Sequence, residues 1–177
     1  MTVRVERIEP KLFHCGIMSR RLRVEQIGAW VSPGSDVHRT LRDSFGRSYW
    51  TRAWTIDGDL AGLAGAIGSP ASPLAFVWLA MTNAATRHPK LLVQEAREAL
   101  DELMSNKIAL QTTCLGSDEA AVRFAIFLGF RVKGTNSASS HPGRRLLLRY
   151  VNDNPDIREP YGQAFGIPMV YHHQESP

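Results

Sequence analysis

The stretch Ser117-Asp-Glu-Ala-Ala-Val-Arg-Phe-Ala-Ile-Phe-Leu-Gly-Phe130 carries the clearest structural signal in the chain. Ser117 is typical of a helix N-cap, and the acidic residues that follow suit a first turn, where the helix dipole favours negative charge. Gly129 before Phe130 is typical of a left-handed C-cap with its hydrophobic contact. We therefore predict a helix between Ser117 and Gly129 whose buried stripe consists of Ala121, Phe124, Ala125 and Leu128.

The segments on either side of this helix predict a mixed α/β fold. A β-hairpin is expected around the turn Asp57-Gly58-Asp59, and the glycines of its second strand indicate a bulge or a close approach. The continuous apolar run 75–80 is typical of a strand buried on both faces. A helical crossover makes one strand pair parallel in an otherwise mostly antiparallel central sheet flanked by helices. The predicted strands are 49–56, 60–67, 75–80, 108–114, 130–132 and 145–151.

Further elements are predicted upstream of these strands. Apolar residues within 3–8 indicate a first strand, residues 20–30 show a helical pattern, and Asp36 is placed to cap a short helix. A longer helix begins within 86–90, with Pro89 in its first turn. Its acidic residues are expected largely on the side opposite its apolar stripe, which consists of Leu92, Ala96, Ala99, Leu100 and Leu103.

Composition places the chain among ordinary globular proteins. It has 177 residues, of which 44% are hydrophobic and 21% are charged, and no apolar run approaches the length of a membrane span. The start of the chain lacks a signal peptide's apolar core, so we expect a protein that stays inside a cell. We predict a folded domain over 1–151 and an extended C-terminal arm over 152–177, which is interrupted by Pro155, Pro160 and Pro168.

The cysteines and the net charge argue against several classes of site and partner. Cys15 and Cys114 are about a hundred residues apart, which favours two buried thiols over a disulfide framework or a metal site. The formal net charge of +4 is a mild excess and weak evidence for a nucleic-acid partner. The arginines form two clusters without interleaved aromatics, which we interpret as solvated faces or protein contacts: Arg20, Arg21 and Arg23, and then Arg144 and Arg145.

The pattern Ala121-x-x-Phe124-x-x-x-Leu128-Gly129-Phe130 resembles the late helix and Leu-Gly-Phe corner of the GNAT N-acetyltransferase fold. The hairpin within 54–62 is similar to the second and third strands of that fold. Among proteins with this fold, the chain resembles a group of tailed-phage proteins, the internal virion protein A type of T7-like phages and their prophage relatives. The likeness lies in Trp78-Leu79-x-x-Thr82 followed by His88-Pro89-Lys90. The resemblance covers roughly residues 49–150.

Resemblance to a GNAT enzyme implies an acetyl-CoA site. The pantetheine arm would lie along the fourth strand, at Trp78, Leu79, Ala80 and Met81. The pyrophosphate would lie at the start of the following helix, where free N–H groups and the positive end of the dipole attract anions. The family's glycine-rich loop is absent from the sequence at 86–92, and Pro89 lacks an N–H. Charge for phosphates could come from Arg87, His88 and Lys90.

The resemblance also implies a tyrosine that protonates the departing thiolate, but its position holds Ala125, which cannot act as an acid. Asp118 stands approximately where the family has an asparagine. We therefore assign no catalytic residue. Three tyrosines could substitute only through their geometry, and five histidines remain as bases of low specificity: Tyr49, Tyr150 and Tyr161, and His14, His38, His141, His172 and His173.

Two hypotheses of function follow. The first is a non-catalytic phage or prophage protein that acts as a structural or assembly component of the virion, without a cofactor, located in the virion or the host cytoplasm. It would bind other virion proteins or copies of itself, rather than a membrane or nucleic acid, through apolar residues of the arm. The second hypothesis is an acetyl-CoA-dependent N-acetyltransferase that acts on an unknown amine. The arm residues are Tyr161, Phe165, Ile167, Met169, Val170 and Tyr171.

Overall fold

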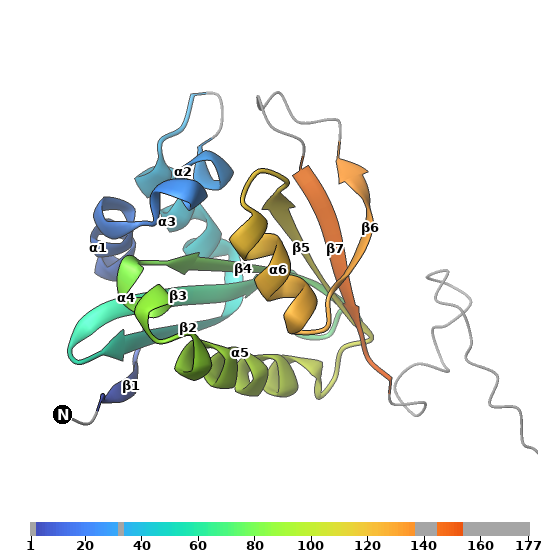
Figure 1. Cartoon of the computed structure of the whole chain (residues 1–177). Helices are drawn as coiled ribbons and strands as arrows, with labels where there is room; N and C mark the ends of the chain where they lie inside the picture. Colours follow the sequence, from blue (N-terminus) through green and yellow to red (C-terminus); the bar gives the residue numbers. More distant parts are fainter. Residues whose placement is uncertain (1–2, 32–33, 137–144, 154–177) are drawn as a thin grey trace, which may run out of the picture.

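Within the residues that the structure describes, seven strands form one sheet in the order β1-β2-β3-β4-β5-β7-β6 (Figure 1). The computed structural model describes residues 3–31, 34–136 and 145–153. All neighbouring strands are antiparallel except β4 and β5, which are parallel and are joined by a helical crossover, as predicted. The strands are β1 (Val5–Ile8), β2 (Ser48–Ile56), β3 (Asp59–Ile67), β4 (Leu74–Met81), β5 (Ala109–Leu115), β6 (Arg131–Asn136) and β7 (Arg145–Val151).

In the described part of the chain, six helices cover the two faces of the sheet. The first three lie together on one face, and α5 and α6 pack on the other (Figure 1). None of the helices in the described ranges is long and apolar enough to cross a membrane. The helices are α1 (Phe13–Arg21), α2 (Val24–Trp30), α3 (Val37–Arg47), α4 (Asn83–Arg87), α5 (Pro89–Met104) and α6 (Glu119–Phe127).

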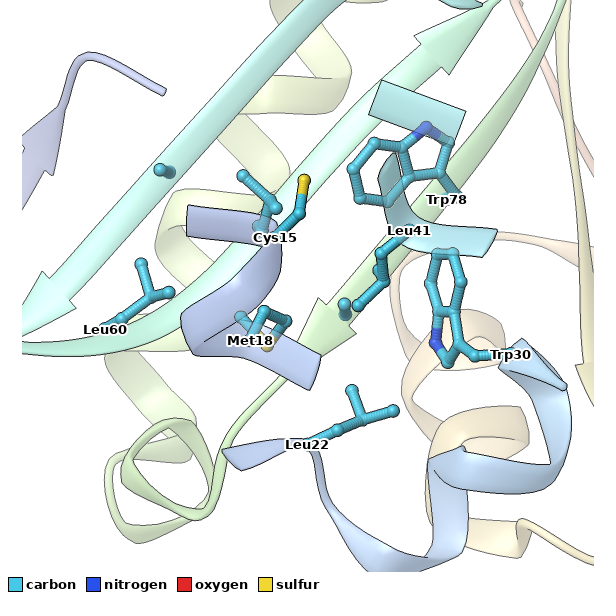
Figure 2. Packing of buried hydrophobic residues seen from close by; sticks show 10 residues of the cluster. Cys15, Met18, Leu22, Trp30, Leu41, Leu60 and Trp78 are labelled. Atoms are coloured by element: carbon cyan, nitrogen blue, oxygen red, sulfur yellow. The ribbon is translucent and has the colours of Figure 1, made fainter. Parts of the chain in front are cut away.

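The core under α1–α3 is built from buried side chains of helices and strands (Figure 2). Met18 of α1 and Leu41 of α3 are completely inaccessible to solvent. The indole rings of Trp30 and Trp78 meet edge to face, with centroids 5.5 Å apart, a favoured arrangement for aromatic pairs. This pair joins α2 directly to β4.

The single helix predicted over 20–30 is wrong, because the chain is extended between α1 and α2. Leu22 forms an isolated antiparallel bridge with Thr82, and the Arg23 N–H donates to the Met81 carbonyl over 3.1 Å. These contacts with the end of β4 interrupt the helix. Asp36 does cap α3 as predicted, since its carboxylate accepts the Arg39 N–H over 2.7 Å.

The β2–β3 hairpin confirms the prediction and explains two of its glycines. Asp57 and Gly58 both have positive φ, as a two-residue hairpin turn requires. A Cβ atom on Gly65 would lie 2.7 Å from the Trp78 ring, and one on Gly62 would lie 2.9 Å from the Trp54 ring. The predicted close approach to this strand is therefore made by tryptophan rings, which pack against the glycines of β3.

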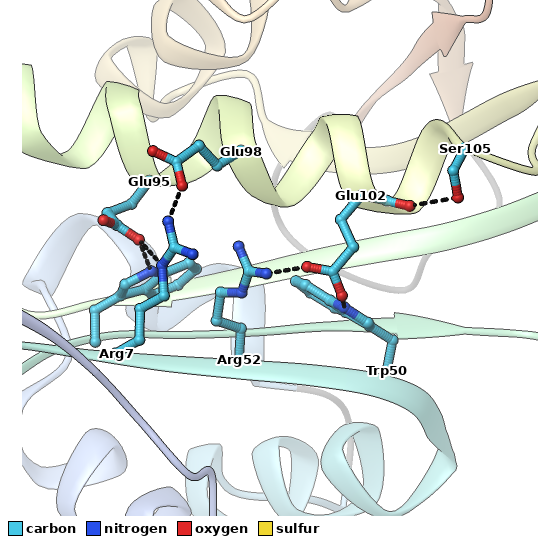
Figure 3. Close-up of polar contacts among 8 residues, drawn as sticks. Arg7, Trp50, Arg52, Glu95, Glu98, Glu102 and Ser105 are labelled. Carbon is cyan, nitrogen blue, oxygen red and sulfur yellow. Dashed lines mark hydrogen bonds and ion pairs between the residues drawn. The ribbon is translucent and has the colours of Figure 1, made fainter.

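The acidic residues of α5 are exposed apart from half-buried Glu95, as expected, yet some of them also hold the helix to β1 and β2 (Figure 3). Glu95 accepts the indole N–H of Trp54 and the Nε–H of Arg7, each over 2.7 Å. Glu102 accepts the indole N–H of Trp50 over 2.7 Å and pairs with Arg52. The arginines and indoles of the strands provide partners that a helical pattern alone does not reveal.

Helix α6 differs in detail from the prediction. The capping residue is Asp118 rather than Ser117, because the Asp118 carboxylate accepts the Ala121 N–H over 3.0 Å. Gly129 has φ +102° and ends the helix as predicted, with Phe130 buried beyond it. Of the predicted stripe, Ala125 is buried, whereas Ala121, Phe124 and Leu128 are half-buried. These half-buried residues line a cavity, described below.

Lys107, which lies between α5 and β5, is unexpectedly buried against the loop that connects β3 to β4. Its ammonium donates to the carbonyl oxygens of Ser69, Pro70 and Ser72 over 3.3, 2.5 and 2.8 Å. Burial lowers the pKa of Lys107. The three carbonyls satisfy the ammonium donors, and the contact ties this loop to the turn before β5.

The first prediction separates core from cavity lining. Leu110→Ala should lower the free energy of unfolding by about 2–5 kcal/mol, because Leu110 is completely buried. Phe124→Ala should cost less, since the half-buried ring already borders open space. Denaturant unfolding followed by circular dichroism measures both, with exposed Ile126→Ala as the control. An equal loss for Leu110 and Phe124 would place Phe124 in the core.

The second prediction concerns the attachment of α5. Glu95→Ala should destabilise the fold by about 1–3 kcal/mol, because it leaves the buried indole N–H of Trp54 without its acceptor. In a Trp54→Phe background the same substitution should cost clearly less, which a double-mutant cycle of unfolding free energies would show. Additive effects of the two substitutions would contradict this assignment. Exposed Asp101→Ala on the same helix is the control.

Candidate active site

Strands β4 and β5 separate after a short parallel contact. Within the described chain they pair only at Leu74–Ala109, Ala75–Leu110 and Phe76–Gln111, although β4 continues to Met81 and β5 to Leu115. Helix α2 lies at the far end of the opening, where a Cβ on Gly28 would lie 3.0 Å from the Leu115 side chain. The two strands therefore form the sides of a gap that α2 closes at its end.

A cavity of about 520 Å³ occupies this gap. It reaches both faces of the sheet, because its lining comes from α2 and α3 on one side and from α5 and α6 on the other. All four tryptophans of the chain line it. Three of their indole N–H groups donate to Ser48, Glu95 and Glu102, which fixes the rings. The tryptophans are Trp30, Trp50, Trp54 and Trp78.

The edge of β4 that faces the gap carries backbone groups available for a ligand. The Met81 N–H donates to the Gln26 side-chain oxygen over 2.9 Å, and its carbonyl accepts from Arg23, so the polar groups of Met81 point away from β3. Backbone groups alternate along a strand, so those of Val77 and Leu79 point the same way, beyond the last β5 partner. An extended ligand with amide groups could bind this edge as an added strand.

Two charged side chains, Asp118 and Arg145, line the otherwise mainly apolar cavity. Asp118 is only 5% exposed and lies at the start of α6. Burial lowers the pKa of Arg145, whose guanidinium donates to the Ala29 carbonyl over 3.1 Å. Cys114 also lines the cavity, and burial together with the nearby Asp118 charge raises the pKa of its thiol to about 11. The interpretation of Arg145 as a solvated or protein-contact residue is therefore corrected.

Three of the four β4 residues expected to contact the pantetheine arm of a cofactor line the cavity, and one does not. Trp78, Leu79 and Met81 line the cavity, whereas Ala80 is buried in the core beneath α1–α3 and lies outside the lining. We had expected β4 to be buried on both faces. Phe76 is 37% exposed, so this prediction does not hold along the whole strand. The opening of the sheet exposes this strand to the cavity.

The loop expected at the pyrophosphate is a short helix. Thr82 caps α4, and the chain then breaks at His88 before α5 begins with Pro89 at its first position. The prediction of one helix that begins within 86–90 thus holds for α5 and misses α4. Arg87 and Lys90 are exposed and His88 is half-buried, and none of the three lines the cavity.

Neither described tyrosine can protonate a group in the cavity. Tyr49 lies 5.2 Å from the Lys107 ammonium, and Tyr150 packs against Phe130; both lie outside the lining. His14 of α1 also lies outside the cavity. Its Nδ1 accepts the backbone N–H of Lys11, and burial lowers its pKa. Among the described residues, no cluster of three metal-ligating side chains occurs. The Tyr161, His141, His172 and His173 positions and the arm residues lie outside the described ranges.

Sequence reasoning missed several lining residues. Trp30, Trp50, Trp54 and Arg145 come from three different elements, and no local spacing connects them. The available signal was the glycine content of β3, which indicated that something large approaches that strand. It did not indicate which side chains would do so.

Comparisons with known proteins agree with this geometry. No family model matches the chain, and no curated protein matches it in sequence. Solved structures do match in three dimensions. A GNAT-family acetyltransferase from Bacillus anthracis has a TM-score of 0.64 at 9% identity, with 85% of this chain and 96% of that chain covered. The chain has the fold of GNAT acetyltransferases.

Two further structures extend this result. The ribosomal-protein-S18-alanine N-acetyltransferase from Escherichia coli has a TM-score of 0.61 at 13% identity, covering 86% of this chain and 98% of its own. An aminoglycoside acetyltransferase AAC(6')-Ib solved with coenzyme A has a TM-score of 0.59 at 15% identity, covering 89% and 98%. At these identities the similarity establishes the GNAT fold.

The third prediction tests the thiol in the cavity. Because the pKa of Cys114 is raised to about 11, its reactive thiolate is scarce near neutral pH, and alkylation should keep accelerating as the pH rises toward 11. Cys15 should stay unreactive in the folded protein, since it is completely buried. Mass spectrometry of iodoacetamide-treated protein measures both sites, with Cys114→Ser as the control. A rate that levels off near pH 8 would contradict the shift.

Proposed function

We propose that this protein binds acetyl-CoA in the cavity between β4 and β5 and transfers the acetyl group to an amine. One observation carries the proposal: the parallel strands separate after three residue pairs and leave a 520 Å³ cavity bordered by a free strand edge. Cavities of a few hundred cubic ångströms with mainly apolar walls and a few polar groups are typical of small-molecule sites.

The residues present suit the pantetheine part of this ligand. The backbone groups of Val77 and Leu79 would pair with its amides, and the tryptophans would contact its apolar segments. The phosphates would lie near the α4–α5 junction, where Arg87 and Lys90 supply charge in place of glycine-loop N–H groups. We therefore expect weaker, more salt-dependent phosphate binding than a glycine loop provides.

Acetyl-CoA supplies a thioester carbonyl when bound. The amine nitrogen forms a bond to the acetyl carbon, and the carbon–sulfur bond breaks. Of the two protons that an ammonium substrate loses, one ends on the departing sulfur and the other in water. The chain's part is to orient the amine and exclude water, since the cavity offers no tyrosine among its described lining residues.

The virion role, ranked first by sequence reasoning, is the second candidate. The replacement of the glycine loop by α4 and Pro89, together with Ala125 at the tyrosine position, favours a fold retained without catalysis. In that case the protein would bind other virion proteins or its own copies through the arm 152–177. We rank it second because a non-catalytic scaffold does not need a cavity lined by every tryptophan of the chain.

The fourth prediction tests the proposed site by calorimetric titration with acetyl-CoA. The wild-type protein should bind with micromolar affinity. Ala121→Phe should weaken binding by at least about ten-fold, because Ala121 lines the cavity and a ring there would fill it. Ala120→Phe is the matched control, since Ala120 is the exposed neighbour on the same helix.

Thermal unfolding of both variants verifies that they fold. No heat of binding at millimolar acetyl-CoA would refute the proposed function and favour the virion role. Equal binding by the wild-type protein and Ala121→Phe would place acetyl-CoA outside this cavity.

A further inference from the structure

The two charges of the cavity lie at the same end of it. Arg145 is the β-sheet partner of Leu115, and the Asp118 N–H donates to the Leu115 carbonyl over 3.0 Å. Helix α2 adjoins the same residue, because Gly28 approaches the Leu115 side chain and the Ala29 carbonyl accepts from Arg145. Asp118 and Arg145 therefore both belong to the part of the cavity that α2 closes.

These opposite charges do not neutralise each other. No ion pair of Asp118 or Arg145 occurs among the described residues, although Asp118 is buried and Arg145 is half-buried. The Asp118 carboxylate accepts one backbone N–H, and the buried Nε–H of Arg145 has no acceptor in the described chain. A buried donor of this kind is costly unless a partner satisfies it. The half-buried Arg145 guanidinium also has no anionic partner in the described chain, and a ligand anion in the cavity would provide one.

The walls beside these charges are apolar and aromatic. Trp30 and Trp78 form an edge-to-face pair that lines the cavity from the α2 side, and Ala29 lies next to them. Such a surface favours an apolar or aromatic group and disfavours a long charged one, which would lose its water. Ligand chemistry at this end is thus restricted to one positive group, one negative group and an apolar body.

We infer that the amine substrate is a small zwitterion of the α-amino acid type with an apolar or aromatic side chain. Asp118 receives the ammonium, the guanidinium of Arg145 receives the carboxylate, and Trp30 and Trp78 contact the side chain. This inference specifies the substrate of the proposed function, and it rests on that function for the acetylation of the amine. The binding of the zwitterion itself can be measured without any acetyl-CoA.

Three related probes separate the contributions of the two charges. Phenylalanine has both charges, phenethylamine has only the ammonium, and 3-phenylpropionate has only the carboxylate. Because all four tryptophans line the cavity, their fluorescence reports occupancy. The wild-type protein should bind phenylalanine at least about ten-fold more tightly than either single-charge probe, as expected for one lost charge-assisted hydrogen bond.

Two variants should respond in opposite ways. Asp118→Asn keeps a capping side chain on α6 and should lose about ten-fold in affinity for phenylalanine and phenethylamine, but not for 3-phenylpropionate. Arg145→Gln keeps a donor for the Ala29 carbonyl and should lose affinity for phenylalanine and 3-phenylpropionate, but not for phenethylamine. Exposed Asp101→Asn and Arg131→Met are the matched controls.

The outcomes distinguish this inference from the proposed function. Probe-specific losses in the two variants support the zwitterion site whether or not acetyl-CoA binds. A protein that binds acetyl-CoA, yet binds the three probes equally or not at all, overturns the substrate inference and leaves the proposed function standing. Losses of equal size for every probe in folded variants would also overturn it, because they would indicate a general change in cavity shape.

Discussion

The parallel contact between β4 and β5 extends over only three residue pairs, and the site depends on where that contact stops. Beyond it, β4 is held by β3 on one side and by α2 at its end, through Gln26 and Arg23. Strand β5 is held by β7 along its whole length. Because each strand keeps a partner strand along its other edge, both can diverge without leaving the sheet, and a cavity results.

The tryptophans show how one set of residues supports the fold and the site. The polar ends of Trp50, Trp54 and Trp78 are held by Ser48 and by acidic residues of α5, while all four rings border the cavity. Glycines at positions 62 and 65 leave space for two of the rings against β3. The cavity walls are therefore fixed by hydrogen bonds before any ligand binds, which reduces the entropy lost on binding.

Much of the fold could be predicted from local patterns. The hairpin turn, Pro89 at the start of α5 and Gly129 at the end of α6 depend on backbone requirements of a few consecutive residues, and all three were confirmed. Predictions that depend on distant partners were less accurate. The break between α1 and α2, the contacts of the α5 glutamates and the burial of Lys107 each depend on a residue far along the chain.

The candidate site shows the same division. The sequence by itself determined that residues 75–80 form a strand, and its resemblance to the GNAT fold implied a cofactor along positions 78–81, three of which line the cavity. Only the tertiary structure decided that Trp30, Asp118 and Arg145 meet there. The physical reason is that local periodicity specifies which face of an element is apolar, whereas the separation of β4 from β5 depends on how several elements pack together.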